Sequence, residues 1–291
     1  MIYGALEAGG TKMVCAIGDE HGKILDRISV PTETPEITLP KLIEYFKDKK
    51  IETLGIGCFG PIDLNRSSST YGCITSTPKI AWRGCDIVGA FKKALNIPVG
   101  FDTDVNGSVL GEVTWGCAKG LENAIYITIG TGVGVGVYAH GKLLHGMLHP
   151  EGGHILLPKH PGDTYKGKCP YHGDRCLEGL AAGPAIEERW GKKGIELANQ
   201  KEVWELEAYY IAVALVNYIM MLSPQKIILG GGIMHQEQLM PLVRSGVIEL
   251  LNGYLSTPEL QDIDNYIVLP SLDDNQGIMG ALKLGMDEQN R

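Results

Sequence analysis

The chain of 291 residues lacks an excess of positive charge, because 26 Lys and Arg stand against 34 Asp and Glu, for a formal net charge of −8. This acidic balance disfavours a surface that binds nucleic acid or an anionic membrane, and we expect neither partner. Long apolar runs are also lacking. The longest candidate, residues 209–222, spans 14 residues and contains Asn217, which favours a core helix over a membrane span.

The N-terminal residues have neither the basic segment nor the long apolar run of a signal peptide. The seven cysteines are odd in number and scattered, so we expect reduced thiols and a cytoplasmic protein rather than a disulfide framework. Only Cys169 and Cys176 are accompanied by histidines at ligand spacing. The other five cysteines have apolar or glycine neighbours and are expected to fill core.

Glycine, by contrast, is abundant at 39 residues and clusters where predicted strands end. Alternating strands and helices along the chain predict an α/β fold. A strand, a Gly-Thr turn and another strand occur twice, around Thr11 and around Thr131, which suggests two related domains with a ligand cleft between them. We expect an N-terminal α/β domain over residues 1–115, with the helix 276–291 as its candidate completion, and a C-terminal α/β domain over residues 116–275.

The two Gly-Thr turns carry groups that can hold phosphate. Each offers glycine backbone N–H groups and a hydroxyl, and the first adds a lysine. The first lacks the Walker A frame, and the second opens a strand instead of the helix of a dinucleotide fingerprint. Either turn alone is well explained as a tight hairpin, but two in equivalent positions indicate a clamp on a polyphosphate. The residues concerned are Gly9, Gly10, Thr11, Lys12, Thr131 and Gly132.

Acidic residues end another predicted strand and enter a predicted helix. One residue should cap that helix, a role that suits Asp102 or Thr103. Asp104 is then a candidate general base that takes a hydroxyl proton during phosphoryl transfer, although the sequence does not choose between capping and catalysis. A further turn, which is either flexible or a shelf for a nucleotide base or ribose, consists of Gly230, Gly231 and Gly232.

Two cysteines and two histidines lie within 23 residues, and a glutamate stands at each end of the stretch from Glu151 to Glu178. The spacing C-x2-H-x3-C in a reduced protein is typical of a structural zinc site, whose four protein ligands leave no open coordination position. The alternative is coincidence in a histidine-bearing loop. His154 is the least secure ligand, because His149 and His160 lie nearby. The predicted zinc ligands are His154, Cys169, His172 and Cys176.

Together these motifs resemble the ROK family of sugar kinases, most closely its fructokinase-like branch, over nearly the whole chain. The resemblance implies an actin-like ATPase (ribonuclease H-like) fold, in which two α/β domains flank a cleft, and a homodimer. It is carried by Glu7–Lys12, Gly57–Pro61, Thr77–Trp82, Asp104, Gly130–Gly132, Glu151, His154, Glu178 and Gly230–Gly232.

The resemblance also implies the roles of individual residues. Asp104 is the implied catalytic residue. Mg²⁺ accompanies ATP, with Glu7 contacting it either directly or through water, and Zn²⁺ lies next to the sugar. The residues implied to bind ATP and its phosphates are Gly9, Gly10, Thr11, Lys12, Thr131, Gly132, Gly183, Gly230, Gly231 and Gly232. Those implied to bind the sugar are Gly60, Pro61, Thr103, Asp104, Glu151, His154 and Glu178.

Three positions depart from the commonest family pattern. Glu7 stands where many members have aspartate, although fructokinase-like members tend to share the glutamate. Thr103 stands where many members have asparagine, which makes a glucokinase less expected. His172 replaces a cysteine in the metal motif, and histidine remains a sound zinc ligand.

The resemblance therefore predicts ATP-dependent phosphorylation of a hexose, with D-fructose converted to fructose 6-phosphate as the first expectation. A glucokinase, a mannokinase and an amino-sugar kinase are the alternatives. A non-catalytic sugar-sensing regulator is less expected, because the first phosphate motif begins within ten residues of Met1 and leaves no room for a helix-turn-helix.

Overall fold

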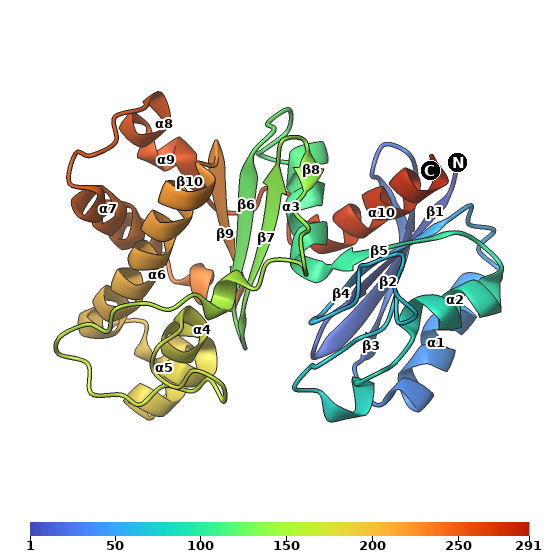
Figure 1. Ribbon diagram of the computed structural model, residues 1–291, viewed down its shortest axis with the longest axis horizontal. Coiled ribbons are helices and arrows are strands. Elements are labelled where there is room, and N and C mark those ends of the chain that lie inside the picture. Colours follow the sequence, from blue (N-terminus) through green and yellow to red (C-terminus); the bar gives the residue numbers. More distant parts are fainter. Residues whose placement is uncertain (291) are drawn as a thin grey trace. The chain divides into compact units, whose positions relative to one another are not determined.

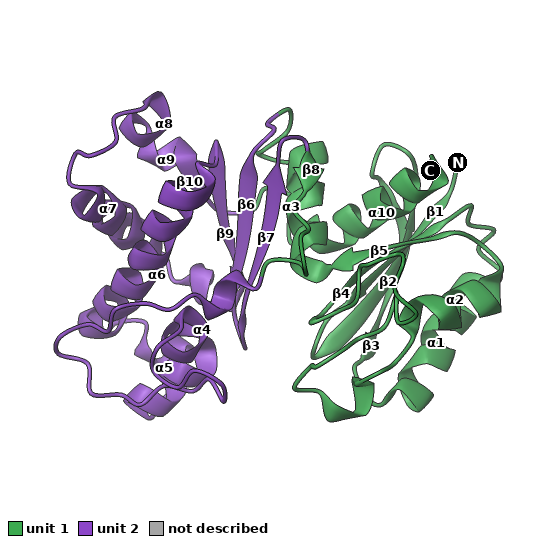
Figure 2. Ribbon diagram, in the orientation of Figure 1, with its two compact units in different colours: residues 1–120, 142–150, 270–291 green, residues 121–141, 151–269 purple. Residues whose placement is uncertain are grey.

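The computed structural model describes residues 1–290, which form two compact units (Figures 1 and 2). Unit 1 comprises residues 1–120, residues 142–150 and the C-terminal segment from Pro270. Unit 2 comprises residues 121–141 and 151–269. The domain boundaries expected from the sequence stay a prediction.

Unit 1 is built on a five-stranded sheet of order β3-β2-β1-β4-β5. The pairs β1–β2 and β2–β3 are antiparallel, whereas β4 runs parallel to both β1 and β5. The strands are β1 (Tyr3–Ala8), β2 (Lys12–Gly18), β3 (Ile24–Pro31), β4 (Leu54–Cys58) and β5 (Val99–Thr103), and the two-residue β8 (Lys142–Leu143) also belongs to this unit. Its helices are α1 (Pro35–Lys47), α2 (Ile87–Leu95), α3 (Asp104–Thr114) and α10 (Gln276–Gln289).

Helices cover both faces of this sheet (Figure 1). Alternate residues of β1 point to opposite faces, as the pleat requires. Leu6 packs in the core that α1 and α2 cover, and Ala5 packs against α10. Helix α10 approaches the strands closely at Gly55, where an added Cβ would lie 1.8 Å from the carbonyl oxygen of Ala281. Only glycine permits this approach, which places the start of α10 beside the carboxyl end of β1.

Unit 2 repeats the arrangement of an antiparallel hairpin beside a parallel strand. In its strand order β10-β9-β6-β7, β6 pairs antiparallel with β7 and parallel with β9, which pairs parallel with β10. The strands are β6 (Ala124–Ile129), β7 (Val133–Ala139), β9 (Lys226–Gly230) and β10 (Ile267–Val268). The helices are α4 (Leu177–Ala181), α5 (Gly183–Trp190), α6 (Lys201–Leu222), α7 (Leu239–Leu251), α8 (Pro258–Gln261) and α9 (Ile263–Tyr266).

The internal repeat in the sequence corresponds to these two hairpins. Ala5 pairs with Ala16 across β1–β2, and Ile125 pairs with Val137 across β6–β7. Each Gly-Thr turn therefore joins the first two strands of its own unit. The predicted α/β class is confirmed.

Apolar residues at helical spacing predict a helix over residues 39–49, but helix α1 begins earlier, at Pro35, which occupies the first helical position, where a missing N–H costs no hydrogen bond. The sequence also predicts a long helix over residues 202–222, and helix α6 confirms it, beginning one residue earlier at Lys201. Its 22 residues are long and apolar enough to cross a membrane by length and composition, but 56% of its most apolar window is buried in the protein's own core.

Candidate active site

The glycine turn of unit 1 is held from one side by Thr32. The Thr32 hydroxyl donates a hydrogen bond to the Gly9 carbonyl (2.8 Å), and its backbone N–H donates to the Thr11 carbonyl (3.0 Å). An added Cβ on Gly9 would lie 2.6 Å from the Lys12 carbonyl oxygen, so the turn requires glycine there. Thr11 and Lys12 are exposed. The geometry suits a phosphate, and phosphate binding stays a prediction.

Asp104 is the first residue of α3, immediately after the helix cap. The cap is Thr103, whose hydroxyl accepts a hydrogen bond from the Asn106 N–H (3.1 Å), so the capping role does not fall to Asp104. The Asp104 carboxylate accepts a hydrogen bond from the Val105 N–H (2.9 Å). Burial nevertheless raises the pKa of Asp104 to about 6. A carboxyl group with this pKa is ionised at neutral pH and is more basic than an ordinary aspartate.

A hydrogen-bond network that the sequence analysis missed supports this helix turn. Asp102 is only 2% exposed, and one of its oxygens accepts hydrogen bonds from the Thr103 N–H (2.8 Å) and the Asn106 amide (2.7 Å). The other oxygen lies 2.7 Å from Nε2 of His145. The sequence placed Asp102 at the end of a predicted strand, as a candidate helix cap. No local pattern linked Asp102 to a histidine 43 residues later.

Glu7, at the end of β1, is a second perturbed carboxyl group in unit 1. Burial, with the charge of Asp104 as the next cause, raises the pKa of Glu7 to about 7. The carboxyl group lies against the start of α10, where a Cβ on Gly277 would be 2.4 Å from Oε1. The carboxyl groups of Glu7 and Asp104 disfavour each other's ionisation. A divalent cation would offset this repulsion, so the pair is a suitable site for one.

The Gly60–Pro61 peptide bond is cis, and it precedes Ile62, whose N–H donates a hydrogen bond to Nε2 of His149 (3.2 Å). His149, which the sequence left open as a metal ligand, is thus a partner of this loop in unit 1. Sugar binding by Gly60 and Pro61 stays a prediction.

The second Gly-Thr turn lies in unit 2 next to the start of α5. The Gly183 N–H donates a hydrogen bond to the Gly130 carbonyl (2.7 Å), so two of the glycines named from the sequence are in direct contact. Gly231 has a φ of +89°, and a Cβ there would lie 2.4 Å from the carbonyl oxygen of Ile129. Three loops with glycines at close-approach positions therefore meet at the ends of β6 and β9.

The four predicted metal ligands come together in unit 2. Their ligand atoms all lie within 4.8 Å of one another. Nδ1 of His154 is 3.7 Å from both Cys169 Sγ and Cys176 Sγ, and Nδ1 of His172 is 3.6 Å from Cys169 Sγ. A tetrahedral zinc ion with ordinary bond lengths places a thiolate and an imidazole nitrogen about 3.6 Å apart, so the donor set and its spacing fit this metal.

The other cysteines and histidines do not join this group. His160 Nδ1 accepts a hydrogen bond from the Gly162 N–H (3.2 Å). Cys15 and Cys58 are buried, as expected, whereas the expectation of core burial was too strong for the other three, which are partly exposed: Cys73, Cys85 and Cys117.

Glu178 connects the metal group with the second glycine turn. Its Oε2 accepts a hydrogen bond from the Val133 N–H (3.0 Å), and its Oε1 lies 3.9 Å from Nε2 of His154. His154 therefore directs one ring nitrogen to the thiols, and its other nitrogen lies near a carboxylate oxygen but beyond hydrogen-bond distance. Glu151 is exposed just before the 3-10 helix Gly152–His154.

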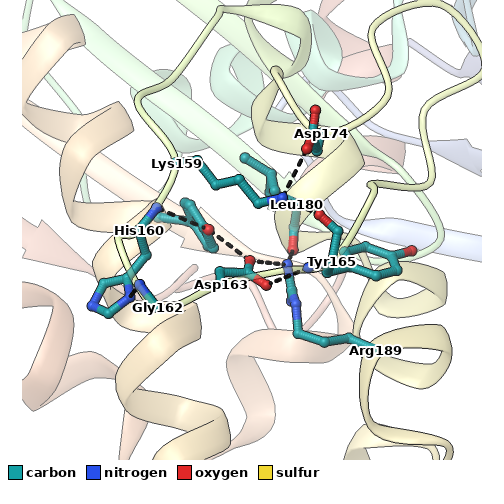
Figure 3. Close-up of polar contacts among 9 residues, drawn as sticks. Lys159, His160, Gly162, Asp163, Tyr165, Asp174, Leu180 and Arg189 are labelled. Atoms are coloured by element: carbon teal, nitrogen blue, oxygen red, sulfur yellow. Dashed lines mark hydrogen bonds and ion pairs between the residues drawn. The ribbon is translucent and has the colours of Figure 1, made fainter.

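Unit 2 also contains a pocket of about 450 Å³ that no sequence motif indicated. Figure 3 shows polar contacts beside this pocket, several of which involve the nearly buried Asp163. The Asp163 carboxylate accepts hydrogen bonds from Arg189 (3.1 Å), the Tyr210 hydroxyl (2.7 Å) and the Tyr165 N–H (2.9 Å). These contacts explain how the loop is fixed onto α5 and α6.

Comparisons with known proteins agree with the resemblance inferred from the sequence. The chain is 48% identical to a fructokinase from Pediococcus pentosaceus over 284 residues, which cover 98% of this chain and 97% of that protein. It is 44% identical to a fructokinase from Zymomonas mobilis, with 100% and 98% covered. A ROK hexokinase from Thermus thermophilus superimposes with a TM-score of 0.80 at 25% identity, covering 100% and 99%.

These matches extend over both units, and the structural neighbour confirms the predicted actin-like ATPase fold. The family model described as "ROK family" matches residues 3–288. The chain belongs to the ROK family.

Proposed function

We propose that this protein is a fructokinase, which transfers the γ-phosphoryl group of ATP to the 6-hydroxyl of D-fructose. Fructokinases at 44–48% identity over nearly the full chain support this proposal. The observation that carries it is Asp104, a carboxylate held by the first turn of α3 with a pKa of about 6. That pKa suits a base that must be ionised at neutral pH and must still accept a hydroxyl proton.

Asp104 orients the attacking hydroxyl and takes its proton as the phosphoryl group moves. Catalysis of this reaction depends mainly on positioning and on compensation of charge, because the transition state is loose. We assign the phosphates to the two Gly-Thr turns, with Gly183 and the Gly230–Gly232 turn beside them. Mg²⁺, held by the phosphates with Glu7 nearby, would supply positive charge to the phosphoryl oxygens. A cation there would also favour the ionised form of Glu7, against its raised pKa.

The hydroxyl groups of the sugar are assigned to Glu151, His154 and Glu178 of unit 2, and to Thr103 and the Gly60–Pro61 loop of unit 1. Carboxylate oxygens accept hydrogen bonds from hydroxyl groups. The proximity of Glu178 and His154 (3.9 Å between Oε1 and Nε2) supports the assignment, because it places polar groups of two of these side chains close together.

We assign Zn²⁺ to His154, Cys169, His172 and Cys176 as a structural ion. Four protein ligands leave no position for a substrate or an activated water, so this metal performs no hydrolysis. Its role is to fix the loop that carries His154. A homodimer and a cytoplasmic location remain part of the proposal on the strength of the family resemblance.

A panel of sugars with MgATP tests the proposal. We expect kcat/KM to be highest for D-fructose and lower for glucose, mannose and N-acetylated amino sugars, measured by coupled ADP release. A higher kcat/KM for glucose or mannose would assign a different sugar as the substrate and would leave the assigned reaction, phosphoryl transfer from ATP, unchanged. The absence of sugar-dependent ADP release from folded, zinc-loaded protein would contradict the enzymatic function itself.

A further inference from the structure

Lys79 lies beside the glycine turn of unit 1, which already contains one lysine, Lys12. A Cβ added to Gly10 would lie 3.0 Å from Cε of Lys79 and 3.9 Å from its Nζ, so the ammonium group lies beside the backbone of the turn. Lys79 belongs to the segment 77–82, which the sequence marked only as part of the family resemblance. The fold thus places the positively charged side chain of Lys79 beside Gly10, although the two residues are 69 positions apart in the sequence.

The backbone of Lys79 is fixed on both sides. Its N–H donates a hydrogen bond to the hydroxyl of the buried Thr77 (3.3 Å), and its carbonyl accepts one from the Trp82 N–H (2.9 Å). Trp82 is 1% exposed, and its indole N–H donates to the Glu33 carbonyl (2.7 Å). A side chain that begins from an anchored backbone loses less entropy when its ammonium group binds a ligand.

The Lys79 ammonium group has no protein counter-charge within residues 1–290, where no hydrogen bond or ion pair involves it. Lys41, Lys47 and Lys49 of the same unit each pair with a carboxylate, and other lysines of this unit that form no ion pair with a described residue, such as Lys12 and Lys93, are exposed. Lys79 is also partly buried, which makes an uncompensated charge less favourable than at an exposed site. A partly buried ammonium group beside glycine N–H groups is a suitable place for an anion.

We propose that Lys79 binds the phosphoryl group that is being transferred, together with the Gly9–Lys12 turn. This inference rests on the proposed function. In the step, the bond between the γ-phosphorus and the bridging oxygen breaks, and ADP leaves with its electron pair. The sugar oxygen forms the new bond to phosphorus, and the hydroxyl proton goes to Asp104. Lys79 keeps its proton and offsets the charge on the phosphoryl oxygens.

The test compares Lys79→Met with Lys93→Met, which removes the same charge from an exposed position on α2. We expect Lys79→Met to lower kcat about 100-fold, as loss of one charge-stabilising donor does elsewhere, while the KM for fructose stays within about twofold. Affinity for MgATP should fall about tenfold, whereas affinity for MgADP, which lacks the transferred group, should not change. Lys79→Arg should recover part of kcat, and Lys93→Met should resemble the wild type.

Unchanged kcat in a folded Lys79→Met protein would overturn the inference, whether or not the KM for fructose rises. Circular dichroism and the melting temperature establish that the variant is folded, and Lys79→Gln provides a second uncharged side chain. The comparison of MgATP with MgADP requires no sugar. A wild type that fails to phosphorylate fructose therefore contradicts the proposed function, while equal loss of affinity for both nucleotides, or loss for neither, contradicts the assignment of Lys79.

Discussion

Replacement of Asp104 by Asn should lower activity and raise stability at the same time. The amide oxygen of Asn retains an acceptor for the Val105 N–H, but it cannot take the proton of the sugar hydroxyl. General-base catalysis contributes about 10²- to 10⁴-fold, so we expect kcat to fall about 10³-fold. Binding of MgATP should persist, because the glycine turns are unaltered.

The expected gain in stability follows from the raised pKa of Asp104. Burial raises this pKa from 3.8 to about 6, so the folded state binds the proton more tightly than the unfolded state. The ionised carboxylate therefore destabilises the fold progressively as the pH rises from 4 to 6, and fully above that range. The shift corresponds to at most about 3 kcal/mol, and we expect about 1 kcal/mol because the side chain is partly exposed. The gain should disappear below about pH 4.

Coupled ADP release measures kcat, and urea unfolding at pH 7.5 and pH 4 measures the free energy of unfolding. Asp48→Asn, an exposed position at the end of α1, serves as the matched control and should leave both quantities nearly unchanged. Near-normal turnover of the Asp104→Asn protein would refute the assignment of the base. Reduced turnover without any gain in stability at pH 7.5 would refute the argument from burial.

Three further predictions concern the pH, the metal and the packing. We expect kcat/KM to decrease about tenfold per pH unit below about pH 6, as Asp104 is protonated, and a flat profile down to pH 5 would contradict this. Elemental analysis of protein never exposed to a chelator should find one zinc per chain, lost in Cys176→Ala but retained in Cys73→Ala; zinc-free wild type would count against the site. Gly280→Ala should cost about 3 kcal/mol in urea unfolding, because its Cβ would lie 1.7 Å from the Gly107 carbonyl oxygen, whereas Gly146→Ala, which meets nothing within 4 Å, should be neutral.

The features that could be predicted from the sequence are those whose partners are close along the chain. The C-x2-H-x3-C spacing identified a group of ligands that the fold does bring together, because the loop returns on itself between Cys169 and Cys176 and the segment after His154 pairs with it at Leu156 and Cys176. Asp104 could be placed because a strand ends and a helix begins around it, and the hairpins around Thr11 and Thr131 follow from apolar strand segments that meet at glycine-rich turns.

The features that were missed depend on contacts between distant segments. The pair Asp102–His145 and the approach of Lys79 to Gly10 join residues that no local periodicity relates. The short helices α4 and α5 have too few residues to produce a recognisable apolar pattern, and their position follows from tertiary packing instead.

The two chemical features of unit 2, the group of metal ligands and the glycine turn, are joined by a single carboxylate. Glu178 accepts a hydrogen bond from the Val133 N–H at the end of the turn and faces His154 through the other oxygen. The opposite nitrogen of His154 faces the thiols, so a metal there would fix the imidazole that lies 3.9 Å from Glu178 Oε1. Removal of the metal should therefore alter the turn before the unit unfolds, because a freed imidazole can move and change the surroundings of the carboxylate that the Val133 N–H contacts. A structural ion in this position would act on phosphoryl transfer solely through the orientation of these two side chains.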